Sequence, residues 1–253
     1  MKGNFNIRKE IKAAVAILGL TFLIAFSERK QGGAVCKEVV VELDNLNENH
    51  FLDEADIMQL VEGSGEPIKG VGIGRIKLKA IENKLKYDKH ILDAELFGDL
   101  KGNLIVNVEL RRPIARIVQS DAPDAYIAED GVIMPVSEKY TSRVLLISGA
   151  VKELLESEDL NKSEEGKQLL AMIEFINADR FWRAQVAQLD LTKNGKVIIY
   201  PQVTGQLIEF GKPDNVEVKF KKLMVFYKEI LPTRGWTRYE RVNLEYEGQV
   251  IAE

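Results

Sequence analysis

The stretch NVELRRPIARI, Asn107–Ile117, decides how the chain is divided. Its apolar residues are spaced as in a β-strand, but Arg111, Arg112 and Pro113 interrupt its middle. Proline cannot donate to a sheet ladder, so it is tolerated at an edge, at a first position or at a break. Either one strand ends at Arg112 and another starts at Pro113, or a single edge strand contains the proline. We favour the first reading, because a proline with fixed φ lets two sheets leave a common plane.

The composition is that of an ordinary globular protein. The chain has 253 residues, of which 45% are hydrophobic and 29% charged, which is enough for one large domain or two small ones. Lys and Arg number 35 against 39 Asp and Glu, a net charge of −4 that argues against a nucleic-acid partner. Cys36 is the single cysteine, so an internal disulfide is excluded.

The first thirty residues differ from the rest. A basic segment, MKGNFNIRKEIK, precedes the uncharged run Ala13–Phe26. We predict that residues 1–34 form a cytoplasmic tail and one membrane helix, because the positive excess lies before the helix. The run is short for a hydrocarbon core of ~30 Å, but the stems of flanking lysines and arginines extend it. A cleaved signal peptide is the alternative, although no small-residue cleavage site adjoins Phe26.

Residues 35–112 read strand, helix, helix, strand, strand. The first helix is expected to start at Asp53, with Asp56 at its third position, and to stop at Gly63. The other elements are expected from the alternation or helical spacing of apolar residues. They are strands at 38–43, 90–99 and 102–111 and a second helix at 75–86.

Residues 113–253 are expected to form a mixed, β-rich domain with two helices, so the fold class is α+β. Asp130-Gly131 and Asn194-Gly195 are typical hairpin turns. One helix opens at Ser163, and the other spans 214–231. In the latter we expect four apolar residues to face a sheet and three lysines to face solvent. The apolar residues are Val218, Leu223, Phe226 and Ile230, and the lysines are Lys219, Lys221 and Lys222.

The last segment, RVNLEYEGQVIAE, alternates as a strand with no later strand to pair with. An open edge is a hazard unless charges blunt it or a partner strand adds to it. Glu245 and Glu247 fit the first reading, and β-augmentation is the second. On the second reading the partner-binding residues are Val242, Asn243, Leu244, Glu245, Tyr246, Glu247, Gly248, Gln249 and Val250.

Five motifs occur in an order that resembles the FtsQ/DivIB family of bacterial cell-division proteins. They are FLDEADIMQLV (51–61), NLIVNVELRRPIARI (103–117), AYIAEDGVIM (125–134), LLISG (145–149) and RVNLEYEGQVI (241–251). The resemblance covers nearly the whole chain. It implies a membrane anchor (1–34), a POTRA domain (35–112) and a β domain (113–253), with the domain seam at Arg111, Arg112 and Pro113.

The resemblance also implies a function without catalysis. Family members bind the bitopic division proteins FtsB and FtsL at the septum of the cytoplasmic membrane. The expected partners are therefore FtsB-like and FtsL-like proteins, with no nucleic acid, small-molecule substrate or cofactor. One departure stands out: familiar members often read Leu-Arg-Tyr in the closing strand, and that arginine meets an acidic partner residue. Glu245 stands at this position.

Two other functions stay open. His50, His90 and Cys36 lack the spacing of a metal or nucleophile motif, so we predict no catalytic or metal residues. A membrane-anchored cell-wall hydrolase with paired carboxylates is nevertheless an alternative, because sequence cannot bring two acids together. A POTRA-containing receptor for outer-membrane proteins is the other. The single POTRA copy and the missing barrel repeat disfavour it.

Overall fold

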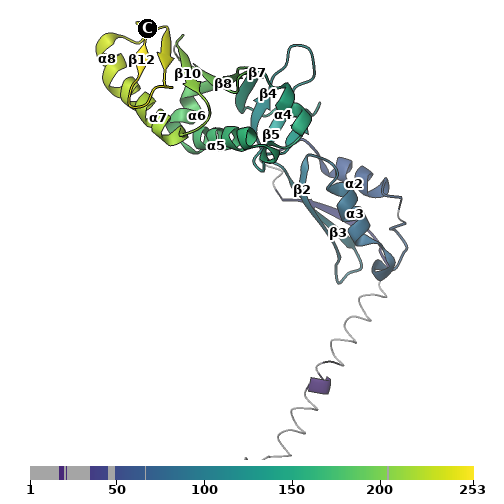
Figure 1. Ribbon diagram of the computed structural model, residues 1–253. Helices are drawn as coiled ribbons and strands as arrows, with labels where there is room; N and C mark the ends of the chain where they lie inside the picture. Colours follow the sequence, from purple (N-terminus) through teal and green to yellow (C-terminus); the bar gives the residue numbers. More distant parts are fainter. Residues whose placement is uncertain (1–16, 20, 22–34, 45–48, 66, 204) are drawn as a thin grey trace, which may run out of the picture. The chain divides into compact units, whose positions relative to one another are not determined.

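The computed structural model describes residues 17–19, 21, 35–44, 49–65, 67–203 and 205–253 (Figure 1). The chain forms two compact units, one of residues 1–45 and 52–109 and the other of residues 46–51 and 110–253. Most of the predicted tail and anchor, residues 1–34, lies outside the described residues. Within the described part of the chain, no helix has the length and apolar character needed to cross a membrane.

The first unit confirms the predicted order of strand, helix, helix, strand, strand. Its sheet has the strand order β1-β3-β2, with β1 parallel to β3. A short 3-10 helix, η1, precedes the second α-helix. The elements are β1 (Val39–Leu43), α2 (Glu54–Glu62), η1 (Ile73–Arg75), α3 (Leu78–Leu85), β2 (Ile91–Gly98) and β3 (Leu104–Leu110).

Helix α2 begins and ends where the sequence predicts. The Asp53 carboxylate accepts the backbone N–H of Asp56 at 2.9 Å, and the Asp56 carboxylate accepts that of Asp53 at 2.9 Å. This capping box satisfies two N–H groups that a helix start otherwise leaves without a partner. At the other end the N–H of Gly63 donates to the Gln59 carbonyl at 2.8 Å.

The second unit is a nine-stranded mixed sheet in the order β12-β11-β10-β9-β8-β7-β4-β5-β6. The pairs β4–β7, β7–β8 and β10–β11 are parallel. Both predicted hairpins, β5–β6 and β8–β9, are confirmed. The strands are β4 (Pro113–Ile117), β5 (Ala125–Ala128), β6 (Ile133–Pro135), β7 (Leu145–Gly149), β8 (Val186–Leu191), β9 (Val197–Pro201), β10 (Leu207–Gly211), β11 (Arg241–Asn243) and β12 (Ile251–Ala252).

The described part of this unit holds more helices than the two predicted (Figure 1). Helices α4 and α6 have six residues each, too few to show a helical period in the sequence. The start of α6 is fixed by Asp179, whose carboxylate accepts the N–H groups of Phe181 and Trp182. The helices are α4 (Lys152–Ser157), η2 (Leu160–Lys162), α5 (Glu164–Ala178), α6 (Arg180–Gln185), α7 (Val216–Val225), the π-helical turn η3 (Phe226–Ile230) and α8 (Leu231–Arg234).

One face of the large sheet forms the core. Inward side chains of consecutive strands, among them Ile117, Ile147 and Leu189, are fully buried with residues of α5 and α7. The opposite face is more polar. Arg116, Leu146, Gln188 and Tyr200 lie side by side on it across β4, β7, β8 and β9.

The predicted orientation of the helix at 214–231 is partly wrong. Leu223 and Phe226 are buried as expected, but Val218 is 59% exposed and Ile230 38%. Phe220 and Tyr227 are buried instead. The wider π turn at Phe226–Ile230 shifts the helix phase, so a regular 3.6-residue period misplaces Ile230.

The prediction that three lysines of this helix face solvent is also wrong. Lys219 is buried, donates to the Lys212 carbonyl at 2.8 Å and pairs with Asp214. Lys222 is bonded to three carbonyl groups. Lys221 alone of the three follows the prediction, since its side chain is 74% exposed.

The residues around Pro113 join the two sheets. β3 ends at Leu110 in the three-stranded sheet, and β4 begins at Pro113 in the nine-stranded sheet. Between them, Arg111 Nε donates to Asp130 at 2.8 Å, and the Arg112 carbonyl accepts the N–H of Glu129 at 2.9 Å.

A short segment before α2 belongs to the second unit. Phe51 is buried against Tyr126, Ala128 and Met134, and its ring lies edge-on to Tyr126 at 5.1 Å between centroids. The amide of Asn49 donates to the Arg111 carbonyl. No pattern in the sequence indicates this packing, because the segment sits between two elements of the first unit.

Candidate partner-binding site

The segment predicted as one strand, residues 241–253, which contains the predicted binding residues Val242–Val250, is divided in the structure. β11 ends at Asn243, residues 244–250 turn, and β12 returns antiparallel with Val242 paired to Ala252 and Asn243 to Ile251. β11 is itself internal, because it pairs on its other side with β10. The prediction of a continuous edge strand is therefore wrong.

Lys222 holds the turn between the two strands. Its Nζ donates to the carbonyls of Leu244 at 2.9 Å, Tyr246 at 2.7 Å and Gln249 at 3.3 Å. Three carbonyl oxygens satisfy the three donors of an ammonium group. Burial lowers the pKa of Lys222, and the neighbouring charge of Lys219 adds to this effect.

Glu245 is paired within its own chain. Its carboxylate accepts two bonds from Lys196 Nζ, at 3.0 and 2.7 Å, and this pairing raises the pKa of Lys196. The Glu245 side chain also lies over Gly211, where an added Cβ would be 2.6 Å from Glu245 Cγ. The charge at this position is thus compensated before any partner arrives.

A second polar cluster fixes the register of β10 and β11. Glu209 accepts a bond from Asn243 Nδ2 at 2.7 Å and pairs with Arg241. The hydrogen bond from Arg241 is the main reason that the pKa of Glu209 is lowered, and it raises the pKa of Arg241 in turn.

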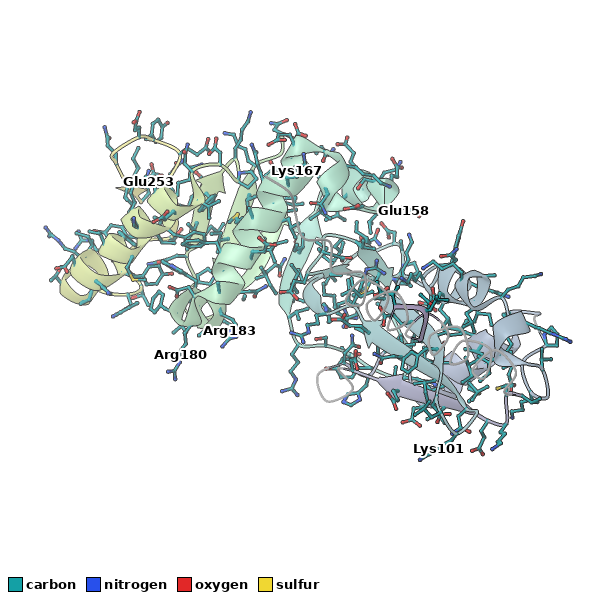
Figure 2. The ribbon with its side chains drawn as sticks, turned by 90° about the horizontal axis from the view of Figure 1, so that it is seen from below. Lys101, Glu158, Lys167, Arg180, Arg183 and Glu253 are labelled. Atoms are coloured by element: carbon teal, nitrogen blue, oxygen red, sulfur yellow. The ribbon has the colours of Figure 1, made fainter. Side chains whose placement is uncertain are left out.

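β12 is the strand at the end of the sheet order (Figure 1), and Glu253, labelled in Figure 2, follows it directly. Arg241 and Glu253 exchange both backbone bonds, at 3.1 and 3.0 Å. Hydrogen-bonded and non-bonded pairs alternate along an antiparallel ladder, so the N–H and C=O of Ala252 point away from β11. Such an outward pair of groups is what an added strand uses.

Exposed apolar side chains occur beside Lys222 on its helix and in the turn that Lys222 holds. Val218 and Val225 of α7 are 59% and 58% exposed, and both lie on the helix face of Lys222, four and three residues away. Tyr246, in the turn that Lys222 holds, is 55% exposed. We call Val218, Val225 and Tyr246 the apolar margin.

The nine predicted partner-binding residues have different environments. Val242 and Leu244 are fully buried in the core, and Asn243 and Glu245 take part in the polar contacts above. Val250 is half-buried, and the other four form the exposed turn: Tyr246, Glu247, Gly248 and Gln249.

Sequence reasoning missed four residues of the site: Lys196, Lys222, Ile251 and Ala252. The predicted strand includes Ile251 and Ala252, but the predicted binding residues stop at Val250. No local signal marks the two lysines, since each acts on a segment more than twenty residues away.

Histidine and cysteine residues have ordinary environments. The ring of His50 meets Tyr140 edge-on at 5.3 Å, His90 Nδ1 lies 2.9 Å from Asp88, and Cys36 is buried. Over the described ranges, no three His, Cys, Asp or Glu side chains are grouped so that they could hold a metal ion.

Comparison with known families matches both parts of the chain. Residues 34–109 match the model of a POTRA-like domain, and residues 112–253 match the model described as FtsQ/DivIB, C-terminal related. No curated protein matches the chain. The second match alone spans more than half of the residues and includes every strand of the nine-stranded sheet. The chain belongs to the FtsQ/DivIB family of bacterial cell-division proteins.

Proposed function

We propose that the protein is a non-enzymatic scaffold of the division machinery that binds FtsB-like and FtsL-like bitopic proteins. In this role it helps to recruit the complex that builds the septal wall. The observation that carries the proposal is the outward-facing backbone of Ala252 in a member of this family. A partner strand that pairs there gains main-chain hydrogen bonds, and neighbouring side chains supply specificity.

The apolar margin supports this choice of edge. An interface needs anchor side chains as well as backbone bonds, and aromatic residues are typical anchors. Val218 and Val225 are exposed on the helix face of Lys222, and Tyr246 is exposed in the turn that leads into β12. In the proposed complex, a partner segment that continues past the added strand contacts these side chains.

Glu245 fits the proposal despite replacing the family's usual arginine. Two directly opposed carboxylates on paired strands repel each other. Here Lys196 compensates Glu245 at 2.7 Å, and Glu245 lies over Gly211 of β10, on the side of β11 away from β12. The carboxylate therefore does not oppose a strand added at β12, and the contact there rests on backbone bonds.

The anchor predicted for residues 1–34 completes the mechanism. It places the protein in the cytoplasmic membrane at the septum, with the bulk outside. Partners confined to the same membrane then meet it at a raised effective concentration.

The test is a binding titration of residues 36–253 with the extracytoplasmic segment of the same organism's FtsB-like protein. Truncation before β11 is a poor variant, because it removes the buried Val242 and Leu244. Ala252→Pro is sharper. It deletes the outward N–H, and proline is tolerated on an edge strand when its missing N–H faces solvent.

Ala252→Gly is the matched control, since it keeps the N–H. We expect Ala252→Pro to weaken binding about tenfold, the loss of roughly 1.4 kcal/mol, and Ala252→Gly to bind nearly as the parent does. Equal binding by the proline variant, with unfolding transitions unchanged, would move the interface away from β12. No binding by any form would leave only the family membership.

A further inference from the structure

At one end of the large sheet, β4 and β8 begin before β7, the strand that lies between them. Register between β4 and β7 begins at Ala115 and Leu145, and between β7 and β8 at Leu146 and Gln188. The first residues of β4 and β8, Pro113–Ile114 and Val186–Ala187, therefore extend past the start of β7. Ala187 has no Cα partner in β9 either, because the register shifts there.

At this end of the sheet lies a groove of about 770 Å³ within the second unit. Residues 141–146 form one wall, and the buried side chains of Ile176 and Val186 line it from α5 and β8. Asn177, also in the lining, donates to the Ile114 carbonyl at 3.0 Å. The groove thus combines apolar side chains with the ends of two strands that have no partner on β7.

The charge of the groove is of one sign. Arg116, Arg143 and Arg183 line it, and no aspartate or glutamate does among the described residues. Arg116 is compensated by Asp124, at 2.7 Å. Arg143 and Arg183 are exposed, and neither forms an ion pair within the part of the chain that the structure describes. Two positive charges are left for a ligand in a protein whose net charge is −4.

We propose that this groove binds an extended acidic segment of a partner protein, at a site separate from β12. Arginine pairs strongly with carboxylates, the apolar lining takes alternate side chains of an extended chain, and the strand ends leave room for its backbone. A compact phosphate fits less well. The helix end at the groove is the C-terminus of α5, whose carbonyl groups repel a concentrated negative charge.

The test uses the full-length chain and a fluorescein-labelled octapeptide of alternating glutamate and valine, with anisotropy as the readout. A glutamine–valine octapeptide is the neutral probe. The variant is Arg143→Gln combined with Arg183→Gln. Arg180→Gln is the matched control, because Arg180 lies on the same short helix as Arg183 and does not line the groove (Figure 2).

We expect the acidic peptide to bind about tenfold more tightly than the neutral one, and the double variant to remove most of this difference. Arg180→Gln and Ala252→Pro leave its binding unchanged. Equal binding of both peptides, or of the acidic peptide to parent and double variant, overturns the proposal. Displacement of the acidic peptide by inorganic phosphate at equal charge concentration also overturns it, because the ligand is then a small anion.

Discussion

At the scale of single residues, Lys222 shows how a surface charge becomes part of the framework. Its neighbours in the sequence, Lys219 and Lys221, have the same type, but the three side chains end in different environments. What distinguishes Lys222 is its position opposite three backbone carbonyls of one turn. Replacing the ammonium therefore changes the backbone of a distant segment.

Lys222→Met keeps much of the stem and removes the donor. We expect a loss of about 1.5–3 kcal/mol in the free energy of unfolding, the range for hydrogen bonds to a charged group. Hydrogen exchange in residues 244–249 should rise even where the protein stays folded. Lys221→Met is the control, since it removes only an exposed pair with Glu217. Equal exchange in both variants would contradict a role for Lys222 in holding the turn.

Glu209 predicts a dependence of stability on pH. The bond from Arg241 holds its pKa below the usual 4.5, so the unfolded chain takes up this proton at a higher pH than the native one. The stabilisation is fully present above pH 4.5 and is lost as the pH falls through the native pKa. We therefore expect the parent and Glu209→Gln to differ less in free energy of unfolding at pH 3 than at pH 7. Urea unfolding at a series of pH values measures this difference. A constant difference across this range would contradict it.

At the scale of elements, local sequence signals predict those caps and turns that depend only on residues adjacent in the sequence. The capping box at Asp53 and the turns at Asp130-Gly131 and Asn194-Gly195 depend on a few consecutive residues, and all three are confirmed. The prediction for the last segment, residues 241–253, was wrong for the opposite reason. Its alternation suits a long strand, but Lys222 and the burial of Val242 and Leu244 fold it into a hairpin. Those contacts come from distant parts of the chain, so no periodicity records them.

Two glycines with positive φ allow the cost of backbone strain to be compared with the cost of a steric clash. Gly195 has φ 71° and open space around it, whereas Gly149, with φ 89°, would place a Cβ 2.3 Å from the Leu191 carbonyl oxygen. Gly195→Ala should cost about 1 kcal/mol, from conformation alone. Gly149→Ala should cost clearly more, because β7 and β8 must also move apart. Thermal unfolding of both variants compares them, and equal losses would contradict the steric part.

At the scale of the whole molecule, the second unit depends on a segment from within the sequence of the first. Phe51→Ala should destabilise the second unit by about 3–5 kcal/mol, as for other large aromatic deletions in a core. The measurement is hydrogen exchange in β5 and β6, which should increase although residue 51 precedes α2. Phe97→Ala, in β2 and 48% exposed, is the control. Unchanged exchange in β5 and β6 would show that Phe51 is dispensable there.

The way the chain passes between the two units also limits where the gene can be recombined. The chain enters the second unit at residue 46, returns to the first at 52 and leaves it again at 110. A crossover near codon 112 would join β5 and β6 to a Phe51 segment of different ancestry. Residues 46–51 and 110–253 are therefore expected to be inherited as one block, and a working chimera of this protein needs three junctions rather than one.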